Sequence, residues 1–284
     1  MLRVCSKEEF LQNADFAWEL AQDPTKSAYH TYCDRIKTRE DFMERRLKAF
    51  ERDTEEMLLF EFEGKVQGII HYYWLPEDHY LQAICFNTSV SAEQALEEFL
   101  AWIGGCFQGY DVYMGFPAEN QAAVTWLAGH GFECVQDACN NTAFPDQLPA
   151  SAVSSGIVRI TRENYDLFRA LHTEEDVYWT AERILEHLDE WIILVKKDAG
   201  EPLGAVFYKE LSKEGWYEIF GMIIPHGEYN PELVKDLANS ALADIKQRGG
   251  RYVTFFCGEE YRETVKECGF LYVGNYLCYK TRLE

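Results

Sequence analysis

The chain has 284 residues, a length that suits two domains of about 140 residues each. Hydrophobic residues make up 47% of it, enough for two cores, yet no apolar run approaches the ~20 residues of a membrane span. The net charge of −21 disfavours binding to nucleic acid and to anionic membranes. The N-terminal stretch contains no apolar signal-peptide segment, so we expect a soluble, cytoplasmic protein.

The chain contains one long internal repeat. Gly68 and Gly204 each stand in the second strand of a predicted strand–turn–strand segment, and nearly half the chain separates them. Gly131 and Gly269 each precede a phenylalanine and are separated by almost the same interval. A period of this length is a whole domain copied in tandem, because solenoid units are only about 20–50 residues long. Any functional site must therefore be sought twice.

The first copy is predicted to alternate strands and helices. Its expected elements are a strand at 2–5, a helix after Ser6, a helix at 39–52, a hairpin at 57–63 and 66–74, a strand at 80–87, a helix at 92–103, a strand at 111–116, a helix at 120–128 and strands after Gly131. The apolar residues of 92–103 recur at helical spacing, which indicates one buried face.

The second copy is predicted to have the same elements in the same order. These are strands at 157–160, 191–197, 203–211 and 216–224, a helix that begins at Pro231 and has its apolar positions between 234 and 245, a strand at 252–257, a short helix ending at 267 and a strand at 270–281. The segment 144–156 contains two prolines, three serines and no clear periodicity, and we interpret 146–156 within it as a linker. We therefore predict an N-terminal domain at 1–145 and a C-terminal domain at 157–284.

One segment carries a specific motif. Residues 120–132 read Asn-Gln-Ala-Ala-Val-Thr-Trp-Leu-Ala-Gly-His-Gly-Phe. This segment, with the order of elements around it, resembles the GNAT (GCN5-related) N-acetyltransferase fold. The second copy keeps Gly269-Phe270 but has Gly258 at the asparagine position. The resemblance implies an α/β fold (α+β, with mixed sheets) built from two tandem GNAT-like acyltransferase domains.

The resemblance also implies a reaction, the transfer of an acetyl group from acetyl-CoA to a primary amine of a small molecule or peptide. Such a reaction needs an anion cradle for phosphates, a donor to the thioester oxygen, a base for the amine and an acid for the thiolate. The family's glycine-rich loop before the amphipathic helix is absent from both copies. In the first copy, Ser91 and Gln94 predict a capping box; in the second, Asn230 predicts an N-cap before Pro231.

Donor-binding residues are expected mainly in the second copy. Backbone groups at Ile223 and Ile224 would face acetyl-CoA, and Gly227, Tyr229 and Asn230 would lie near its phosphates. In the first copy, Asn120 matches the family's asparagine and is expected at the cofactor.

The second copy is also expected to carry the chemistry. Glu218 is the predicted base, since a carboxylate within an apolar strand has its pKa raised toward working pH, whereas the first copy has Gln82 at that position. The family's tyrosine position falls on Leu127 and Val265, so Tyr261 is the predicted substitute acid. His71 and His79 are weaker candidates for the base.

Other interpretations stay open at this stage. A GNAT-shaped module that has lost catalysis and binds a small molecule or a partner protein is the main alternative. The acceptor could be a polyamine, an antibiotic, a peptide terminus or an amino acid, and the oligomeric state is not readable. No metal site is expected, because histidines and cysteines show no ligand spacing.

Overall fold

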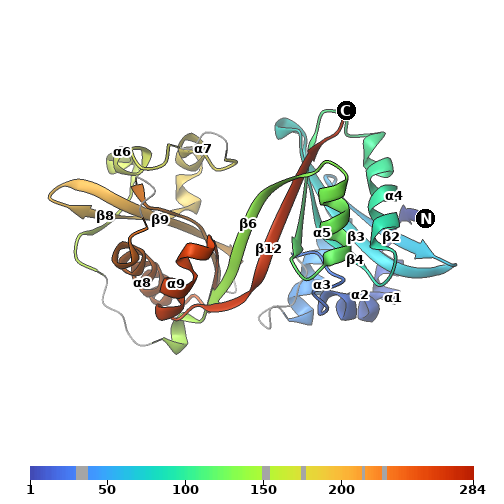
Figure 1. Cartoon of the computed structure of the whole chain (residues 1–284), viewed down its shortest axis with the longest axis horizontal. Helices are drawn as coiled ribbons and strands as arrows, with labels where there is room; N and C mark the ends of the chain where they lie inside the picture. The colour runs from blue at the N-terminus through green and yellow to red at the C-terminus, as the bar shows by residue number, and fades with distance from the viewer. Residues whose placement is uncertain (30–37, 149–153, 174–176, 213–214, 226–228) are drawn as a thin grey trace. The chain divides into compact units, whose positions relative to one another are not determined.

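The computed structural model describes residues 1–29, 38–148, 154–173, 177–212, 215–225 and 229–284. They form two compact units (Figure 1). Unit 1 consists of Met1–Asp137 together with Asn275–Glu284, and unit 2 consists of Ala138–Gly274. The C-terminal end of the chain therefore belongs to the same unit as its N-terminus.

Unit 1 is a mixed sheet with helices on both faces. Its strands are β1 (Leu2–Val4), β2 (Glu55–Phe62), β3 (Lys65–Leu75), β4 (Tyr80–Thr88), β5 (Asp111–Pro117) and the part of β12 (Leu271–Arg282) from Asn275 onward. Its helices are α1 (Lys7–Gln12), α2 (Ala14–Ala21), α3 (Arg39–Leu47), α4 (Ala92–Gly104) and α5 (Gln121–Gly129). The strand order is β1-β2-β3-β4-β5-β12, with β4 and β5 parallel and every other neighbouring pair antiparallel.

Unit 2 repeats this architecture. Its strands are β7 (Ile157–Arg159), β8 (Ile192–Asp198), β9 (Glu201–Ser212), β10 (Trp216–Ile223), β11 (Tyr252–Cys257) and the part of β6 (Glu133–Ala143) from Ala138 onward. Its helices are α6 (Asp166–Arg169), α7 (Ala181–Glu186), α8 (Pro231–Gln247) and α9 (Arg262–Glu267). The order β7-β8-β9-β10-β11-β6 again contains one parallel pair, β10 with β11.

The sixth strand of each unit is exchanged. In unit 1, residues 276–282 of β12 pair with β5, and in unit 2, residues 139–143 of β6 pair with β11. Each half of the sequence thus completes the sheet of the other half. The division into domains at 1–145 and 157–284 with a linker at 146–156 stays a prediction, and the compact units change over at 137/138 and 274/275.

Each sheet buries side chains on both faces. Along β2, Leu58 and Phe60 pack toward α4 and α5, whereas the alternate residues Met57 and Leu59 pack toward α1, α2 and α3. Unit 2 shows the same alternation along β8, with α8 and α9 on one face and α6 and α7 on the other (Figure 1). This burial explains why the strands read as nearly continuous apolar runs.

The repeated glycines have a common structural cause. A Cβ at Gly68 would lie 2.8 Å from the carbonyl oxygen of Asn87, and a Cβ at Gly204 would lie 2.8 Å from that of Ile223. Asn87 and Ile223 are separated in sequence by the same interval as the two glycines. In both units the glycine therefore lets the end of the next strand approach closely. Gly131 and Gly269, with φ of +81° and +98°, follow helices in the left-handed conformation that glycine favours.

One predicted local feature is wrong. Ser91 precedes α4 with φ 51° and ψ 48°, and its side chain makes no capping hydrogen bond. Gln94 instead donates to Glu98 at 2.9 Å. The left-handed backbone of Ser91 is outside the extended conformation that a capping residue requires. At α8 the prediction is confirmed: Asn230 is the N-cap, accepting from the Leu233 N–H at 3.1 Å, and Pro231 begins the helix.

Candidate active site

The parallel strands of each unit pair over only a short stretch before they separate. In unit 2, Trp216–Ile219 pair with Tyr252–Phe255. Beyond that point β10 pairs with β9 and β11 pairs with β6, and among the described residues the two strands make no further pairing with each other. In unit 1, β4 and β5 separate in the same way after Ala83 and Met114. Each unit therefore has one opening between strands, where backbone polar groups need another partner.

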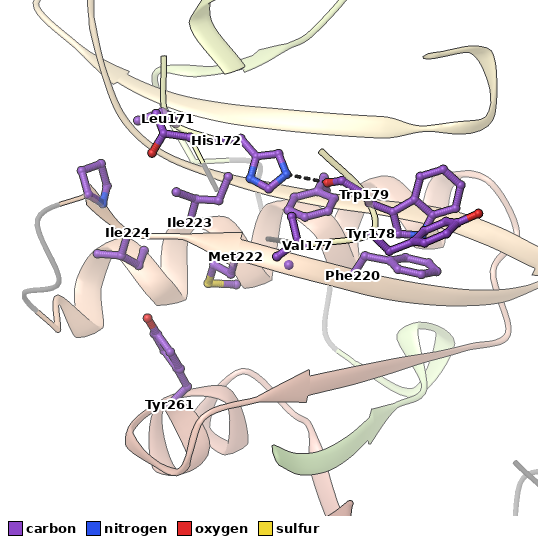
Figure 2. Close-up of a pocket in the computed structure, with 14 residues that line it drawn as sticks. Leu171, His172, Val177, Tyr178, Trp179, Phe220, Met222, Ile223, Ile224 and Tyr261 are labelled. Carbon is purple, nitrogen blue, oxygen red and sulfur yellow. Dashed lines mark hydrogen bonds between the residues drawn. The ribbon is translucent and has the colours of Figure 1, made fainter. Parts of the chain in front are cut away.

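In unit 2 this opening borders a cavity of about 500 Å³. The volume lies in the range of small-molecule sites. Most of the residues that line it are apolar or aromatic in type, and Figure 2 shows several of them, from separate segments: Tyr178, Trp179, Phe220, Met222 and Ile223. The polar side chains that line it include His172, Thr173 and Tyr261.

In unit 1 the chain itself fills the corresponding opening. The Thr88 N–H at the end of β4 donates to the Lys26 carbonyl at 3.0 Å, and the Tyr29 N–H donates to the carbonyl of Gly115 in β5 at 3.0 Å. Between them, the Ala28 N–H donates to Asn87 Oδ1 at 2.9 Å. Residues 27–29 are all buried. We call residues 26–29 the unit 1 plug, because they satisfy the strand edges that unit 2 leaves to its cavity.

Unit 1 also carries a buried ion cluster on the face that packs against α1, α2 and α3. Glu55 Oε2 lies 2.7 Å from Arg45 Nη1 and 2.8 Å from His71 Nε2, and Arg52 Nη1 lies 2.6 Å from Glu55 Oε1. Burial by itself would raise the pKa of Glu55, but hydrogen bonds from His71, Arg45 and Arg52 hold that pKa well below its ordinary value. Burial, followed by the charge of Arg46, lowers the pKa of His71 to about 3.

The two units therefore differ at equivalent positions. His71 of unit 1 corresponds to Phe207 of unit 2, by the same offset that relates Gly68 to Gly204. Phe207 lines the open cavity, whereas His71 is fully buried against Glu55. The sequence made His71 a weaker candidate for the base. In the structure its Nε2 is hydrogen-bonded to Glu55 and is therefore not available to a substrate. His79 is exposed in unit 1 after β3.

His172 is the buried polar side chain on the wall of the unit 2 cavity. It is 7% exposed and contacts the rings of Phe168 and Phe207, with ring centroids 5.2 and 5.3 Å away; those two rings also contact each other, at 5.5 Å. Its Nε2 lies 2.7 Å from the carbonyl oxygen of Trp179, the contact drawn as a dashed line in Figure 2. Because a carbonyl only accepts, Nε2 must carry the proton and Nδ1 holds the lone pair when the ring is neutral.

The Trp179 ring is held by a cation. Lys209 Nζ lies 4.5 Å from the centroid of Trp179, 4.8 Å from that of Trp191 and 5.4 Å from that of Phe220. Glu190 approaches the same ammonium at 3.7 Å. Lys209 is therefore largely enclosed behind the aromatic end of the cavity, and it fixes the segment whose carbonyl holds His172.

Three of the residues predicted from sequence line the cavity. Ile223 and Ile224 follow the point where β10 leaves β11, and Tyr261 comes from the short 3₁₀ turn Glu259–Tyr261 after β11. Burial, followed by the charge of Glu260, raises the pKa of Tyr261, so its hydroxyl stays protonated. In the view of Figure 2, the stretch 222–224 lies between His172 and Tyr261.

Two further predicted residues lie next to this group. Tyr229 is 43% exposed, its ring stacks edge-on to Tyr261 with centroids 5.8 Å apart, and its hydroxyl bonds Thr264. Asn230 caps α8 and is exposed. Gly227, predicted at the phosphates, lies outside the described residues.

The remaining two predicted residues lie elsewhere. Glu218 is half-buried in β10, directly opposite Lys209 of β9, and it is not among the residues that line the cavity. Asn120 is buried in unit 1, where its Oδ1 accepts from the Ala123 N–H at 3.3 Å and its Nδ2 donates to the Ser27 carbonyl at 3.2 Å. Asn120 therefore secures both a helix end and the unit 1 plug.

Sequence reasoning missed His172, Trp179 and Phe220. His172 and Trp179 fall in an irregular segment, where neither periodicity nor a motif singles them out. Phe220 lies within β10, on the opposite face from Tyr217 and Ile219, and a register shift in the β9–β10 pairing lies between Ile219 and Gly221. Among the described residues, no group of His, Cys, Asp or Glu is placed to share a metal ion. No described helix combines the length and apolar character that a membrane crossing requires.

The fold is that of GNAT N-acetyltransferases, in tandem. A GCN5-related N-acetyltransferase from Sphaerobacter thermophilus is similar over 100% of this chain and 96% of its own, with a TM-score of 0.64 at 15% identity. A tandem GNAT protein from the clavulanic acid biosynthesis pathway is similar over 100% and 99%, with a TM-score of 0.56 at 10% identity. No family model and no curated protein matches the sequence. The predicted fold class and the resemblance are thus confirmed.

A third solved structure is similar over only part of its own length. It is the glucosamine N-acetyltransferase region of a fungal multi-domain β-N-acetylglucosaminidase, with a TM-score of 0.62 at 10% identity. It covers 99% of this chain, whereas this chain spans 38% of that protein.

Proposed function

We propose that this protein is an N-acetyltransferase that moves an acetyl group from acetyl-CoA to a primary amine, and that unit 2 carries the reaction. The observation that carries the proposal is the contrast between the two strand openings. Unit 2 leaves its opening to a cavity of about 500 Å³, whereas unit 1 fills its own with residues 26–29.

The described residues of unit 2 suit the acyl end of the donor. The edge of β10 beyond Ile219, which no other described strand pairs on the β11 side, leads to Ile223 and Ile224 and offers backbone groups and apolar side chains to a thioester chain. When bound, acetyl-CoA supplies the activated acetyl group. Tyr261, protonated at neutral pH, would deliver a proton to the departing sulfur.

The charges at the start of α8, where the phosphates of acetyl-CoA are expected, are less favourable for an anion. Asn230 already takes one N–H of the first turn of α8, and Glu232 lies in that turn. Lys235 is held by Glu267 at 2.8 Å and by Glu232 at 3.3 Å. Neighbouring carboxylates weaken the binding of an anion at a helix N-terminus. We therefore expect the protein to bind acetyl-CoA with modest affinity.

Calorimetry with acetyl-CoA tests the proposal, and the expected stoichiometry is one site per chain. Ile224→Trp, which fills the opening of unit 2, should abolish the heat. Val90→Trp is the matched control, because Val90 is 42% exposed at the corresponding turn of unit 1 and should leave binding unchanged. At 100 times Kd the donor should stabilise the protein by about 2.7 kcal/mol.

Turnover is then measured as thiol release with a panel of amines: a polyamine, an aminoglycoside, an amino acid and a peptide. Binding without thiol release from any amine would favour the alternative, a ligand-binding module on the same fold. Absence of binding at millimolar acetyl-CoA, or two equal sites, would contradict the proposal.

A further inference from the structure

We propose that His172 is the general base of unit 2, taking the proton of the acceptor amine at Nδ1. The inference rests on the proposed acetyl transfer and assigns its base to a residue other than Glu218. Four observations carry it: the place of His172 on the cavity wall, its hydrogen bond, its ring contacts and the anchoring of its partner.

The hydrogen bond decides the tautomer. Trp179 offers a carbonyl oxygen at 2.7 Å from Nε2, and that oxygen has no proton to give. The neutral ring therefore keeps its proton on Nε2 and presents Nδ1 as an acceptor. No described residue takes Nδ1 as a hydrogen-bond partner. The basic nitrogen is thus left for a group that enters the cavity.

The same hydrogen bond suits the protonated ring. When Nδ1 gains a proton, the imidazolium still donates from Nε2 to the Trp179 carbonyl, and a charged donor makes a stronger bond. The carbonyl therefore plays the orienting part that a carboxylate plays beside other catalytic histidines. Phe168 and Phe207, which pack against each other, both contact the ring and limit its rotation.

Lys209 anchors this arrangement from behind. Its ammonium contacts the rings of Trp179 and Trp191, and those two rings stack edge-on with centroids 5.0 Å apart. Because Trp179 lies in an irregular segment, its carbonyl would otherwise be free to move. Lys209 is therefore a positioning residue that acts through Trp179.

The proposed step balances in protons and electrons. An N–H bond of the acceptor ammonium breaks, its electron pair stays on nitrogen and the proton goes to Nδ1 of His172. That pair forms the bond to the acetyl carbon, and the C–S bond breaks with its pair going to sulfur. Sulfur takes a proton from Tyr261, which recovers one from the new amide nitrogen. His172 then releases its proton to water.

Glu218 provides the matched comparison. It stands in β10 opposite Lys209 and is not among the residues that line the cavity. His172→Gln keeps a donor near Nε2 for the Trp179 carbonyl but has no basic nitrogen. Glu218→Gln likewise keeps the size of the side chain and removes only its carboxylate.

The experiment compares wild type, His172→Gln, Glu218→Gln and Lys209→Met with acetyl-CoA and the amine that wild type turns over best. We expect His172→Gln to lower kcat by 10²- to 10⁴-fold with KM for the amine changed less than threefold, and to remove the acidic limb of the kcat/KM profile. Glu218→Gln should stay within threefold of wild type, and Lys209→Met should lower kcat by about tenfold.

Two readouts do not depend on turnover. Nitrogen NMR of wild type should show His172 protonated at Nε2 and bare at Nδ1. Acetyl-CoA affinity and the unfolding midpoint of His172→Gln should match wild type. The opposite tautomer, an unchanged kcat in His172→Gln or a large loss in Glu218→Gln would overturn the assignment while leaving the proposed function in place. A wild-type protein that releases no thiol would remove both.

Discussion

At the scale of single residues, the two units use equivalent positions for opposite purposes. Position 71 in unit 1 is a buried histidine bound to Glu55, and position 207 in unit 2 is a phenylalanine on a cavity wall. An ion cluster of this kind is costly to bury but also costly to break, because each partner left behind keeps an uncompensated charge or donor. The physics of this cluster leads to two predictions.

The first concerns pH. The folded pKa of His71, about 3, lies below the unfolded value near 6.5, so the unfolded chain binds more protons. The stability that depends on neutral His71 is complete above pH 6.5 and is lost as pH falls toward 3, by up to about 1.4 kcal/mol per pH unit. In His71→Gln, the free energy of unfolding should fall less steeply between pH 6.5 and 4.5 than in wild type. Urea unfolding at several pH values measures this free energy. His79→Gln, which changes an exposed histidine, is the control and should show the same dependence on pH as wild type. Equal slopes in all three proteins would show that His71 charges in the folded state.

The second concerns Glu55, whose side chain is 3% exposed. Its depressed pKa adds stability that is present above pH about 4.5 and lost below it. Glu55→Gln should cost about 3–5 kcal/mol at pH 7, since two arginines and His71 lose their anion. Glu61→Gln on the same strand breaks a pair with Arg3 in which both side chains are only half-buried, and it should cost at most about 1 kcal/mol. Denaturant midpoints compare the two, and equal losses would argue against a buried cluster.

At the scale of elements, regular patterns were readable and irregular ones were not. The stripe of apolar residues in 92–103 became α4, and the Asn230-Pro231 pair became the start of α8, because both signals act within one or two turns. Ser91 has the residue type of a cap but a left-handed backbone. The unit 1 plug carries no sequence signature, since its hydrogen bonds go to β4, β5 and Asn120.

Asn120 offers a test at this scale, because the resemblance assigns it to the cofactor and the structure binds it to Ala123 and Ser27. Asn120→Ala should destabilise the protein by about 1–2 kcal/mol through loss of the cap. It should leave the calorimetric affinity for acetyl-CoA unchanged. A weakened affinity with normal stability would instead restore Asn120 to the donor site.

At the scale of the whole molecule, the exchanged strands make the two halves of the sequence interdependent. Residues 275–284 complete the sheet of unit 1, and Tyr276 is buried there against Gly115. Residues 138–143 complete the sheet of unit 2. A half expressed alone therefore lacks a strand that its own core needs and carries one that it cannot use.

Coexpression of 1–145 and 157–284 as separate chains measures this dependence. We expect the two fragments to copurify through a tag on either one, and each fragment alone to be aggregated or to unfold at markedly lower denaturant. Hydrogen exchange should show Tyr276–Arg282 protected only when both fragments are present. Two independently stable monomers of native-like stability would contradict the strand exchange.

The sequence by itself determined the duplication, the order of strands and helices, the tandem GNAT fold and three residues of the cavity wall. The duplication and the order of elements follow from local signals, because periodicity, turn glycines and helix caps act between neighbours in the chain. The tandem GNAT fold and the three cavity residues were implied by the resemblance of residues 120–132, and of the order of elements around them, to that family. Three features were decided by the tertiary structure alone. These are the presence of the cavity at the strand opening of unit 2, the exchange of the sixth strand between the two halves of the sequence, and the position of His172 on the cavity wall with its proton on Nε2. Such features depend on hydrogen bonds between residues far apart in sequence, and these bonds produce no periodic pattern in the sequence.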